Sequence, residues 1–208
     1  GDLTFTRSND TATRIGPNSL IEKVRTNSFI YSEDLTNAAW TKDNITISSN
    51  VIANPLDGAL TADGAIATAT YTYHSATRPS TVISGLINIS IYVKPAAQSN
   101  LEIESLGGQV SFNLSAGTIN YETGGTGTIT SVGGGWYRCS VSTTVASSSY
   151  VAFLIMPTTG TSEGFTGDGS TIDMYYYGAQ VESGDVATDY IATTTTAVSV
   201  GPIADLPR

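Results

Sequence analysis

The feature that most constrains the fold is an alternation of apolar and polar residues with a period of two. In GLINISIYV, residues 85–93, aliphatic side chains recur at every second position, and Asn88, Ser90 and Tyr92 lie between them. WYRCSVSTTV, residues 136–145, repeats the pattern. Because successive side chains of a strand point to opposite faces, each stretch is predicted to be a strand with one buried face. The buried face of the second strand is predicted to carry Tyr137, Cys139, Val141 and Val145, and the other face Trp136, Arg138, Ser140 and Ser142.

Other stretches extend this prediction to most of the chain. QVSFNL, residues 109–114, alternates in the same way, and SYVAFLIM, residues 149–156, is apolar on both faces, which indicates a central strand. Glycine-rich segments such as SLGGQ, GGTGT and VGGGW separate the runs and are typical of turns. Roughly ten short strands therefore predict an all-β fold, an antiparallel β-sandwich or jelly roll with a short N-terminal β-hairpin extension.

Three segments are predicted along the chain. Residues 1–27 contain two short strands, LTFTR and LIEKV, around a polar loop, and they form an N-terminal hairpin or connector. Residues 28–199 form the jelly-roll domain, and residues 200–208 form a C-terminal tail. The sequence begins with Gly1 rather than Met, so we expect a processed product or a fragment of a longer polypeptide.

Composition and charge exclude several classes of partner. Only 13% of the 208 residues are charged, and 9 Lys and Arg stand against 18 Asp and Glu, which gives a net charge of −9. Nucleic acids and anionic membranes are bound by basic patches, and the sequence shows none. No apolar run reaches the ~20 residues of a membrane span. We therefore expect no nucleic-acid or membrane partner, and the acidic balance favours a neutral or cationic partner or bound Ca²⁺.

The order of several motifs resembles a module that recurs in structural proteins of tailed phages and prophages. These motifs run from about Leu3 to Ser199 and include FTRSNDTATRIGPNSLIEKV, YSEDLTNAAWTKDN, ISIYVKPAA, VSFNLSAGTI, GGGWYRCSV and FTGDGSTIDMYYYGAQVESGDVATDYI. The family is similar in pattern to carbohydrate-binding modules with a β-jelly roll. The resemblance implies a non-enzymatic domain of tail fibres, spikes or head fibres at the virion surface. Tyr177 stands where the closing strand of the family usually has Trp.

The run MYYYG places three aromatic rings side by side in the last predicted strand. By alternation and by the family pattern, Met174 and Tyr176 face the core, and Asp173, Tyr175 and Tyr177 face outward. Rings on an open sheet face suit sugar binding, because the C–H faces of pyranoses stack on aromatic rings. The alternative is that the rings pack under a loop, under the N-terminal hairpin or against a neighbouring subunit. We expect this for at least one of them.

The predicted ligand-binding residues are Tyr175, Tyr177 and Trp136, with Asp173 and Gln180 as polar partners. Trp136 follows three glycines on the polar side of its strand, which would place it at a rim, although a structural role is favoured for it and for Trp40. His74, the single histidine, is expected on an exposed loop.

Calcium is the metal that the sequence favours, as a structural ion. The resemblance to jelly-roll carbohydrate modules implies a pairing of an early acidic residue, Glu33 or Asp34, with Asp173 late in the chain, and oxygen ligands suit this cation. Asp168 in TGDGS is a further candidate. Ordinary turn capping by aspartate explains the same residues, and no cofactor is expected to be required.

Catalytic motifs are poorly supported, so no enzyme is expected. GTSEG, residues 160–164, matches the G-x-S-x-G pattern of hydrolases but lacks a following helix and a later histidine. Glu102 and Glu104 lie on one strand face, side by side, with no partner across a cleft, and a solvated face explains them better than a glycosidase pair.

The leading hypothesis is a phage virion surface module that binds host-surface glycans for attachment. Weak sites would gain strength from many copies, in a homo-oligomer such as a trimer. The alternative is a structural decoration or oligomerisation domain of a virion fibre or capsid, which contacts other virion proteins and has no ligand. A catalytic depolymerase ranks third, because no acid–base pair is evident.

Overall fold

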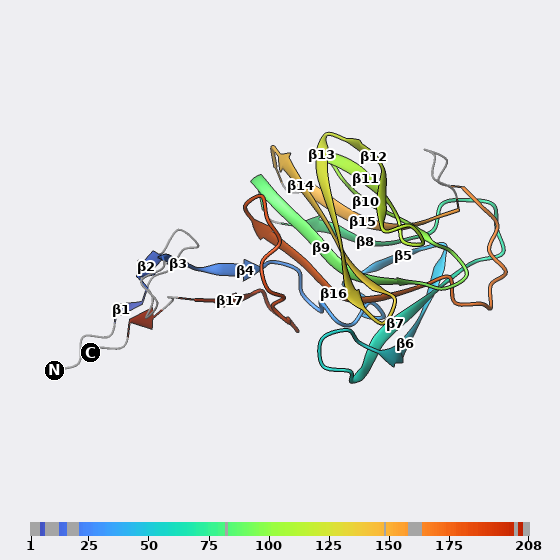
Figure 1. Cartoon of the computed structure of the whole chain (residues 1–208), viewed down its shortest axis with the longest axis horizontal. Coiled ribbons are helices and arrows are strands. Elements are labelled where there is room, and N and C mark those ends of the chain that lie inside the picture. Colours follow the sequence, from blue (N-terminus) through green and yellow to red (C-terminus); the bar gives the residue numbers. More distant parts are fainter. Residues whose placement is uncertain are drawn as a thin grey trace.

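The alternating stretches form two six-stranded antiparallel sheets that pack as a sandwich (Figure 1). The structure is a computed structural model that describes residues 5–6, 13–15, 21–81, 83–147, 149–157, 164–201 and 204–205. The β9 sheet contains, in spatial order, β13 (Gly125–Gly133), β14 (Trp136–Val145), β9 (Gly85–Pro95), β16 (Met174–Ser183), β7 (Leu60–Ala67) and β6 (Ile45–Ala53). The β10 sheet contains β12 (Thr118–Thr123), β11 (Gly108–Asn113), β10 (Asn100–Ser105), β15 (Ser149–Met156), β8 (Ser75–Thr81) and β5 (Thr41–Asp43). The predicted all-β sandwich is confirmed.

The remaining strands are short and pair outside the two sheets. The pairs are β1 (Phe5–Thr6) with β18 (Ala204–Asp205), β2 (Thr13–Ile15) with β3 (Ile21–Lys23), and β4 (Arg25–Asn27) with β17 (Val198–Val200). An N-terminal hairpin is therefore present, but its first strand comes from the segment predicted to be a polar loop. Its β-branched residues Thr13 and Ile15 favour a strand. The division into residues 1–27, 28–199 and 200–208 stays a prediction.

The core lies between the two sheets, where the alternation predicted it. Ile87, Ile89 and Ile91 of β9 are fully buried. Phe153 of β15 lies opposite, and its ring centroid is 6.0 Å from that of Trp40. Burying one such side chain contributes about 1.5–3 kcal/mol. The favoured structural role of Trp40 is confirmed, because the ring is 1% exposed within this core.

The strand β15 is central, as its apolar sequence predicted. It lies between β10 and β8 in the β10 sheet. Its inner face carries Phe153 into the main core, and its outer face adds Leu154 to a separate small cluster with Ala152, Met156 and Tyr150. Both faces of this strand are therefore packed.

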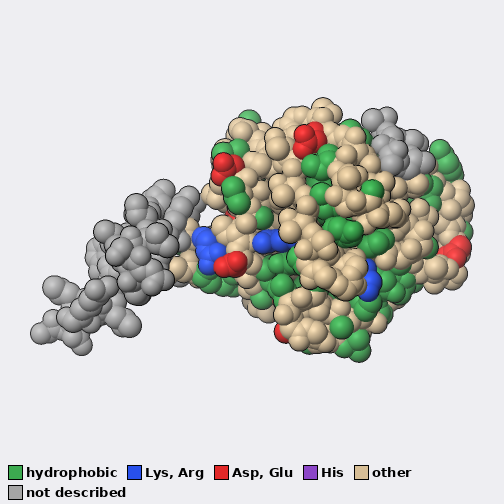
Figure 2. Space-filling model, viewed as in Figure 1, with side chains coloured by type: hydrophobic (Ala, Val, Ile, Leu, Met, Phe, Trp, Pro, Cys, Tyr) green, Lys and Arg blue, Asp and Glu red, His purple; other side chains and the backbone are tan. Residues whose placement is uncertain are grey.

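The surface carries few charges. On the face seen in Figure 2, acidic and basic side chains are scattered among uncharged polar and apolar atoms. Within the described ranges, no helix is long and apolar enough to cross a membrane.

Candidate functional site

The outer face of the β9 sheet is built from four strands whose register aligns side chains in rows across the sheet. One row contains Thr128, Ser140, Ser90 and Gln180, and the next contains Thr130, Arg138, Tyr92 and Tyr177. Side chains that stand directly opposite each other on neighbouring strands are close enough to contact. The outward positions predicted for β14, β9 and β16 therefore meet those of β13, which includes part of the GGTGT segment predicted to be a turn, in one continuous polar and aromatic face.

A bulge in β16 decides which side chains join this face. The register with β9 shifts between Tyr177 and Gln180, and Gly178 has a φ of 62°. This left-handed conformation favours glycine, and a β carbon here would lie 3.2 Å from the rings of Tyr190 and Tyr92. Because a bulge inserts one extra residue, Tyr177 and Gln180 both point outward.

The three tyrosines divide between the two faces as predicted. Tyr176 is 1% exposed in the main core, whereas Tyr177 is 5% exposed and Tyr175 half-buried in the outer cluster. The Tyr177 hydroxyl donates to Glu33 Oε1 at 2.7 Å, and its ring lies 5.8 Å from that of Tyr190. Burial, together with the carboxylate of Glu33, raises the pKa of Tyr177. Tyr177 is thus covered by the chain itself, and Tyr175 is partly open.

The segment that covers Tyr177, residues 184–191, is held on the sheet by Gln180. Gln180 Oε1 accepts the Ile191 N–H at 2.8 Å, and its Nε2 donates to Glu182 Oε1 at 2.8 Å. Glu182 in turn accepts the backbone N–H and the hydroxyl of Thr188 at 2.8 and 2.6 Å. Gln180 is fully buried and uses both ends of its amide within the chain. Its predicted ligand role therefore has no support in the geometry.

Trp136 and Asp173 are also covered. Trp136 is 4% exposed and packs with Tyr177 and Tyr92 in the outer cluster, not at an open rim. Asp173 is 5% exposed, and its Oδ2 accepts the Ala67 N–H at 2.8 Å. Burial raises the pKa of Asp173, although this hydrogen bond opposes the rise. The structure thus gathers Tyr175, Tyr177 and Trp136 into one cluster, but Asp173 bonds to the backbone instead.

The carboxylates predicted to bind calcium have separate partners. Glu33 accepts from Tyr177, Asp34 accepts the Thr36 N–H at 3.0 Å, and Asp173 accepts from Ala67. Among the residues that the structure describes, no group of three or more His, Cys, Asp or Glu is placed to hold a metal ion. The calcium site stays a prediction.

Asp168 caps its own turn. Its Oδ1 accepts the N–H groups of Ser170 and Thr171 at 2.8 and 2.7 Å. The Thr171 hydroxyl donates to Oδ2, and these hydrogen bonds hold the pKa of Asp168 well below its usual range. Turn capping, the alternative to a metal ligand, accounts for this residue.

Two predictions of solvent exposure are wrong. His74 is fully buried, with Nδ1 2.7 Å from the Asn44 carbonyl oxygen and Nε2 3.0 Å from that of Phe165. Glu102 is also fully buried, and the Tyr121 hydroxyl donates to it from β12. In both cases the cover comes from segments distant in sequence. Local alternation reveals the face of a residue but not what lies over it.

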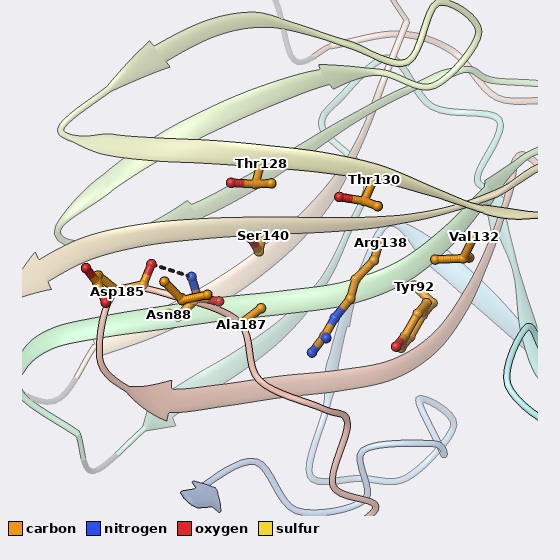
Figure 3. Close-up of a pocket in the computed structure, with 10 residues that line it drawn as sticks. Asn88, Tyr92, Thr128, Thr130, Val132, Arg138, Ser140, Asp185 and Ala187 are labelled. Carbon is orange, nitrogen blue, oxygen red and sulfur yellow. Dashed lines mark hydrogen bonds between the residues drawn. The ribbon is translucent and has the colours of Figure 1, made fainter. Parts of the chain in front are cut away.

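An open groove of about 410 Å³ lies on the same outer face, and we call it the β9 groove (Figure 3). Its lining residues are Asn88, Tyr92, Thr128, Thr130, Val132, Arg138, Ser140, Asp185, Val186 and Ala187. Strands β13, β14 and β9 form the floor, and residues 185–187, after β16, form a wall. The groove offers hydroxyls, an amide and a guanidinium next to apolar carbon, which is a mixture suited to a small polar ligand.

Arg138 and Tyr92 lie together in this groove and were not predicted as ligand residues. The Arg138 Cζ lies 5.3 Å from the centre of the Tyr92 ring, in cation–π contact. Burial raises the pKa of Tyr92, and the nearby Arg138 opposes the rise. The alternation placed both side chains on the outer face. Their pairing depends on the register of β14 on β9, which spacing alone does not reveal.

A second groove, of about 280 Å³, lies on the outer face of the β10 sheet. Asp43 and Glu104 line it together with the half-exposed ring of Tyr73. It is separated from the β9 groove by the whole thickness of the sandwich. It therefore provides positions for control variants.

Comparisons with known proteins assign no family to this chain. No protein-family model matches the sequence, and no curated protein does. Among solved structures, the chain is similar to the enzymatically active domain of tailspike protein 4 of bacteriophage CBA120, with a TM-score of 0.44 and 11% sequence identity. The match covers 74% of this chain and 21% of that chain, so this chain spans about a fifth of the matched structure. Membership of the phage family that the motifs resemble stays a prediction.

Proposed function

We propose that this chain is a non-enzymatic module that binds host-surface glycans, on the surface of a phage virion, through the β9 groove. The observation that carries the proposal is the lining of the groove. Thr128, Thr130 and Ser140 offer hydroxyls that donate and accept hydrogen bonds, and Asn88 and Arg138 add an amide and a guanidinium. The hydroxyl groups of a sugar ring likewise donate and accept hydrogen bonds, so they can pair with these side chains.

The size of the groove suits this role. Its volume of about 410 Å³ falls in the range of roughly 300–1,000 Å³ that small-ligand sites occupy. Val132, Val186 and Ala187 supply apolar surface for the C–H faces of a sugar. The aromatic residues first predicted as the binding platform are instead packed beside the groove, because the Tyr177 ring lies against Tyr190 and Trp136 is buried in the same cluster.

A binding role fits the groove better than hydrolysis. Its lining contains a single carboxylate, that of Asp185, whereas glycosidases use a pair of carboxylates. Residues 160–163 of the GTSEG motif lie outside the described residues. The location on a virion comes from the sequence resemblance, and weak binding per site would be strengthened by many copies.

The test is a glycan-array screen of the folded chain and of a Thr128→Val/Thr130→Val variant. Valine keeps the shape and strand preference of threonine but removes the hydroxyl. We expect a glycan signal that the variant loses, while Tyr73→Ala, in the groove of the β10 sheet, keeps it. A blank array from folded protein, or binding that survives the loss of both hydroxyls, would refute the proposal.

The alternative, a decoration or oligomerisation domain, required the outward tyrosines to be buried against a neighbouring subunit. Tyr177 is covered by Tyr190 of the same chain, so it offers little surface to a neighbour. The expected homo-oligomer, such as a trimer, stays a prediction. Sedimentation analysis of the chain measures it directly.

A further inference from the structure

We propose that the β9 groove selects glycans that carry an anionic group, a carboxylate, sulfate or phosphate, and that Arg138 contacts this group. The inference rests on the proposed function and narrows its ligand class. It departs from the expectation, based on net charge, of a neutral or cationic partner. The reason is local, since the chain as a whole carries a net charge of −9, whereas the groove is lined by one arginine, Arg138, and one carboxylate, Asp185.

Arg138 is held in place on the floor of the groove. Its Nη2 donates to Ser90 Oγ at 3.1 Å, and its guanidinium lies against the Tyr92 ring. Figure 3 shows the side chain extended beside Tyr92 and below Thr130. A guanidinium oriented by two contacts loses little freedom when it binds an anion with its remaining donors.

No carboxylate within the described ranges neutralises Arg138. The ion pair that the structure describes joins Arg25 to Asp189 at 3.6 Å, and none of the described carboxylate oxygens lies within 4.0 Å of Arg138. Its Nε is buried and has no hydrogen-bond partner in the part of the chain that the structure describes. Removing a cation from water without pairing it is unfavourable, so an anionic ligand gains from meeting it.

Arg78 and Arg25 lie outside the β9 groove, and Arg78 Nε, like Arg138 Nε, is buried without a partner among the described residues. Arg78 Nη1 donates to the Ala39 carbonyl, and its guanidinium lies over the Trp40 ring. Arg25 lies beside the exposed carboxylate of Asp189. Arg138 is thus the arginine that lines the β9 groove.

Asn88 provides a second, independent sign of a ligand. It is 2% exposed and lines the groove, and its Nδ2 donates to the Asp185 carbonyl at 3.2 Å (Figure 3). The Oδ1 on the other branch of the amide is buried and has no partner among the residues that the structure describes. A buried acceptor left unpaired is unfavourable, and a hydrogen-bond donor from a ligand would remove this penalty.

The spacing of the two groups fits one sugar residue. Asn88 and Ser90 are successive outward positions of β9, about 7 Å apart along the strand. The Arg138 guanidinium reaches the Ser90 position through its hydrogen bond. A ring with its acid group at Arg138 therefore directs a hydroxyl donor toward Asn88 Oδ1.

The net charge of −9 opposes the binding of an acidic glycan only weakly, because most carboxylates of the chain lie outside the lining of the groove. At physiological salt the Debye length is about 8 Å, so distant carboxylates are screened while a direct contact with Arg138 is not. The exposed Asp185 on the groove wall is the exception, because it lines the same space. Asp185→Asn is therefore expected to strengthen binding of an acidic glycan.

The experiment uses the full chain and two matched polymer pairs. The first pair is polygalacturonate and the same polymer with its carboxyl groups reduced to alcohols, and the second is dextran sulfate and dextran. We expect about tenfold or tighter binding of at least one anionic member, by calorimetry at physiological salt. Arg138→Gln is expected to abolish this preference. Arg138→Lys, which keeps the charge, is expected to retain part of it.

The outcomes separate this inference from the proposed function. Equal binding within both pairs overturns the inference and leaves glycan binding standing. A preference that survives Arg138→Gln, or one lost completely in Arg138→Lys, also overturns it. Absence of binding to every glycan, by protein with an unchanged thermal melt, overturns the proposed function itself. Tyr73→Ala serves as the control and is expected to bind like the original chain.

Discussion

Tyr177→Phe is predicted to destabilise the fold and to leave glycan binding unchanged. The substitution removes one hydroxyl, which donates to Glu33 Oε1 at 2.7 Å from a ring that is 5% exposed. A hydrogen bond to a charged group contributes about 1.5–3 kcal/mol when buried. Because Glu33 is partly solvated, we expect a loss near or just below the lower end of this range, about 1–2 kcal/mol.

The assay is thermal and urea unfolding of Tyr177→Phe beside Tyr175→Phe. For a chain of this size, 1 kcal/mol corresponds to about 2–4 °C in Tm, so Tyr177→Phe should melt about 2–8 °C lower. Tyr175 is half-buried, and the structure describes no hydrogen bond of its hydroxyl, so its change should stay within about 0.5 kcal/mol. Equal effects of the two variants, or loss of glycan binding with unchanged stability in Tyr177→Phe, would refute this reasoning.

Three further predictions concern the strain, ionisation and burial of single residues. Gly178→Ala should cost about 1–3 kcal/mol in urea unfolding, because it forces a left-handed φ and a contact with the Tyr190 ring, and unchanged stability would contradict the bulge. Stability should fall above pH 10, since burial raises the pKa of Tyr176 and Tyr190 above their unfolded values, so the unfolded chain releases protons first. Each of these tyrosines contributes about 1.4 kcal/mol per pH unit in that range, and pH-dependent unfolding measures the slope. His74→Phe should cost about 2 kcal/mol, because the ring nitrogens lie against the carbonyl oxygens of Asn44 and Phe165 and at least one of these carbonyls loses a hydrogen-bond donor, and a change near zero would restore the exposed-loop prediction.

The period of two made the sandwich predictable from the sequence. Alternation assigned Ile89 to the core and Tyr92 to the outer face, and both assignments hold because a strand allows only two directions for a side chain. It also put Tyr176 and Tyr177 on opposite faces, and the family resemblance then assigned Tyr176 to the core. Face assignment depends on local geometry alone, which a short stretch of sequence contains.

The segments that cover each sheet face are distant in sequence from the residues they cover. The sequence did not predict which segments these are. Residues 184–191 fold back over Tyr177, held by Gln180, although nothing in their composition marks them as a lid. The β9 groove likewise combines Thr130, Arg138 and Tyr92 from three strands. Their neighbourhood follows from strand order and register, which the sequence alone leaves open.

The central claim is that ligand binds in the β9 groove and not on the tyrosine run or on the β10 sheet. The most direct test is an NMR titration of the labelled chain with a glycan found on the array. We predict amide shift changes concentrated in residues 88–92, 128–132 and 138–140. Changes centred on Tyr73 and Tyr150, around the groove of the other sheet, would contradict the account.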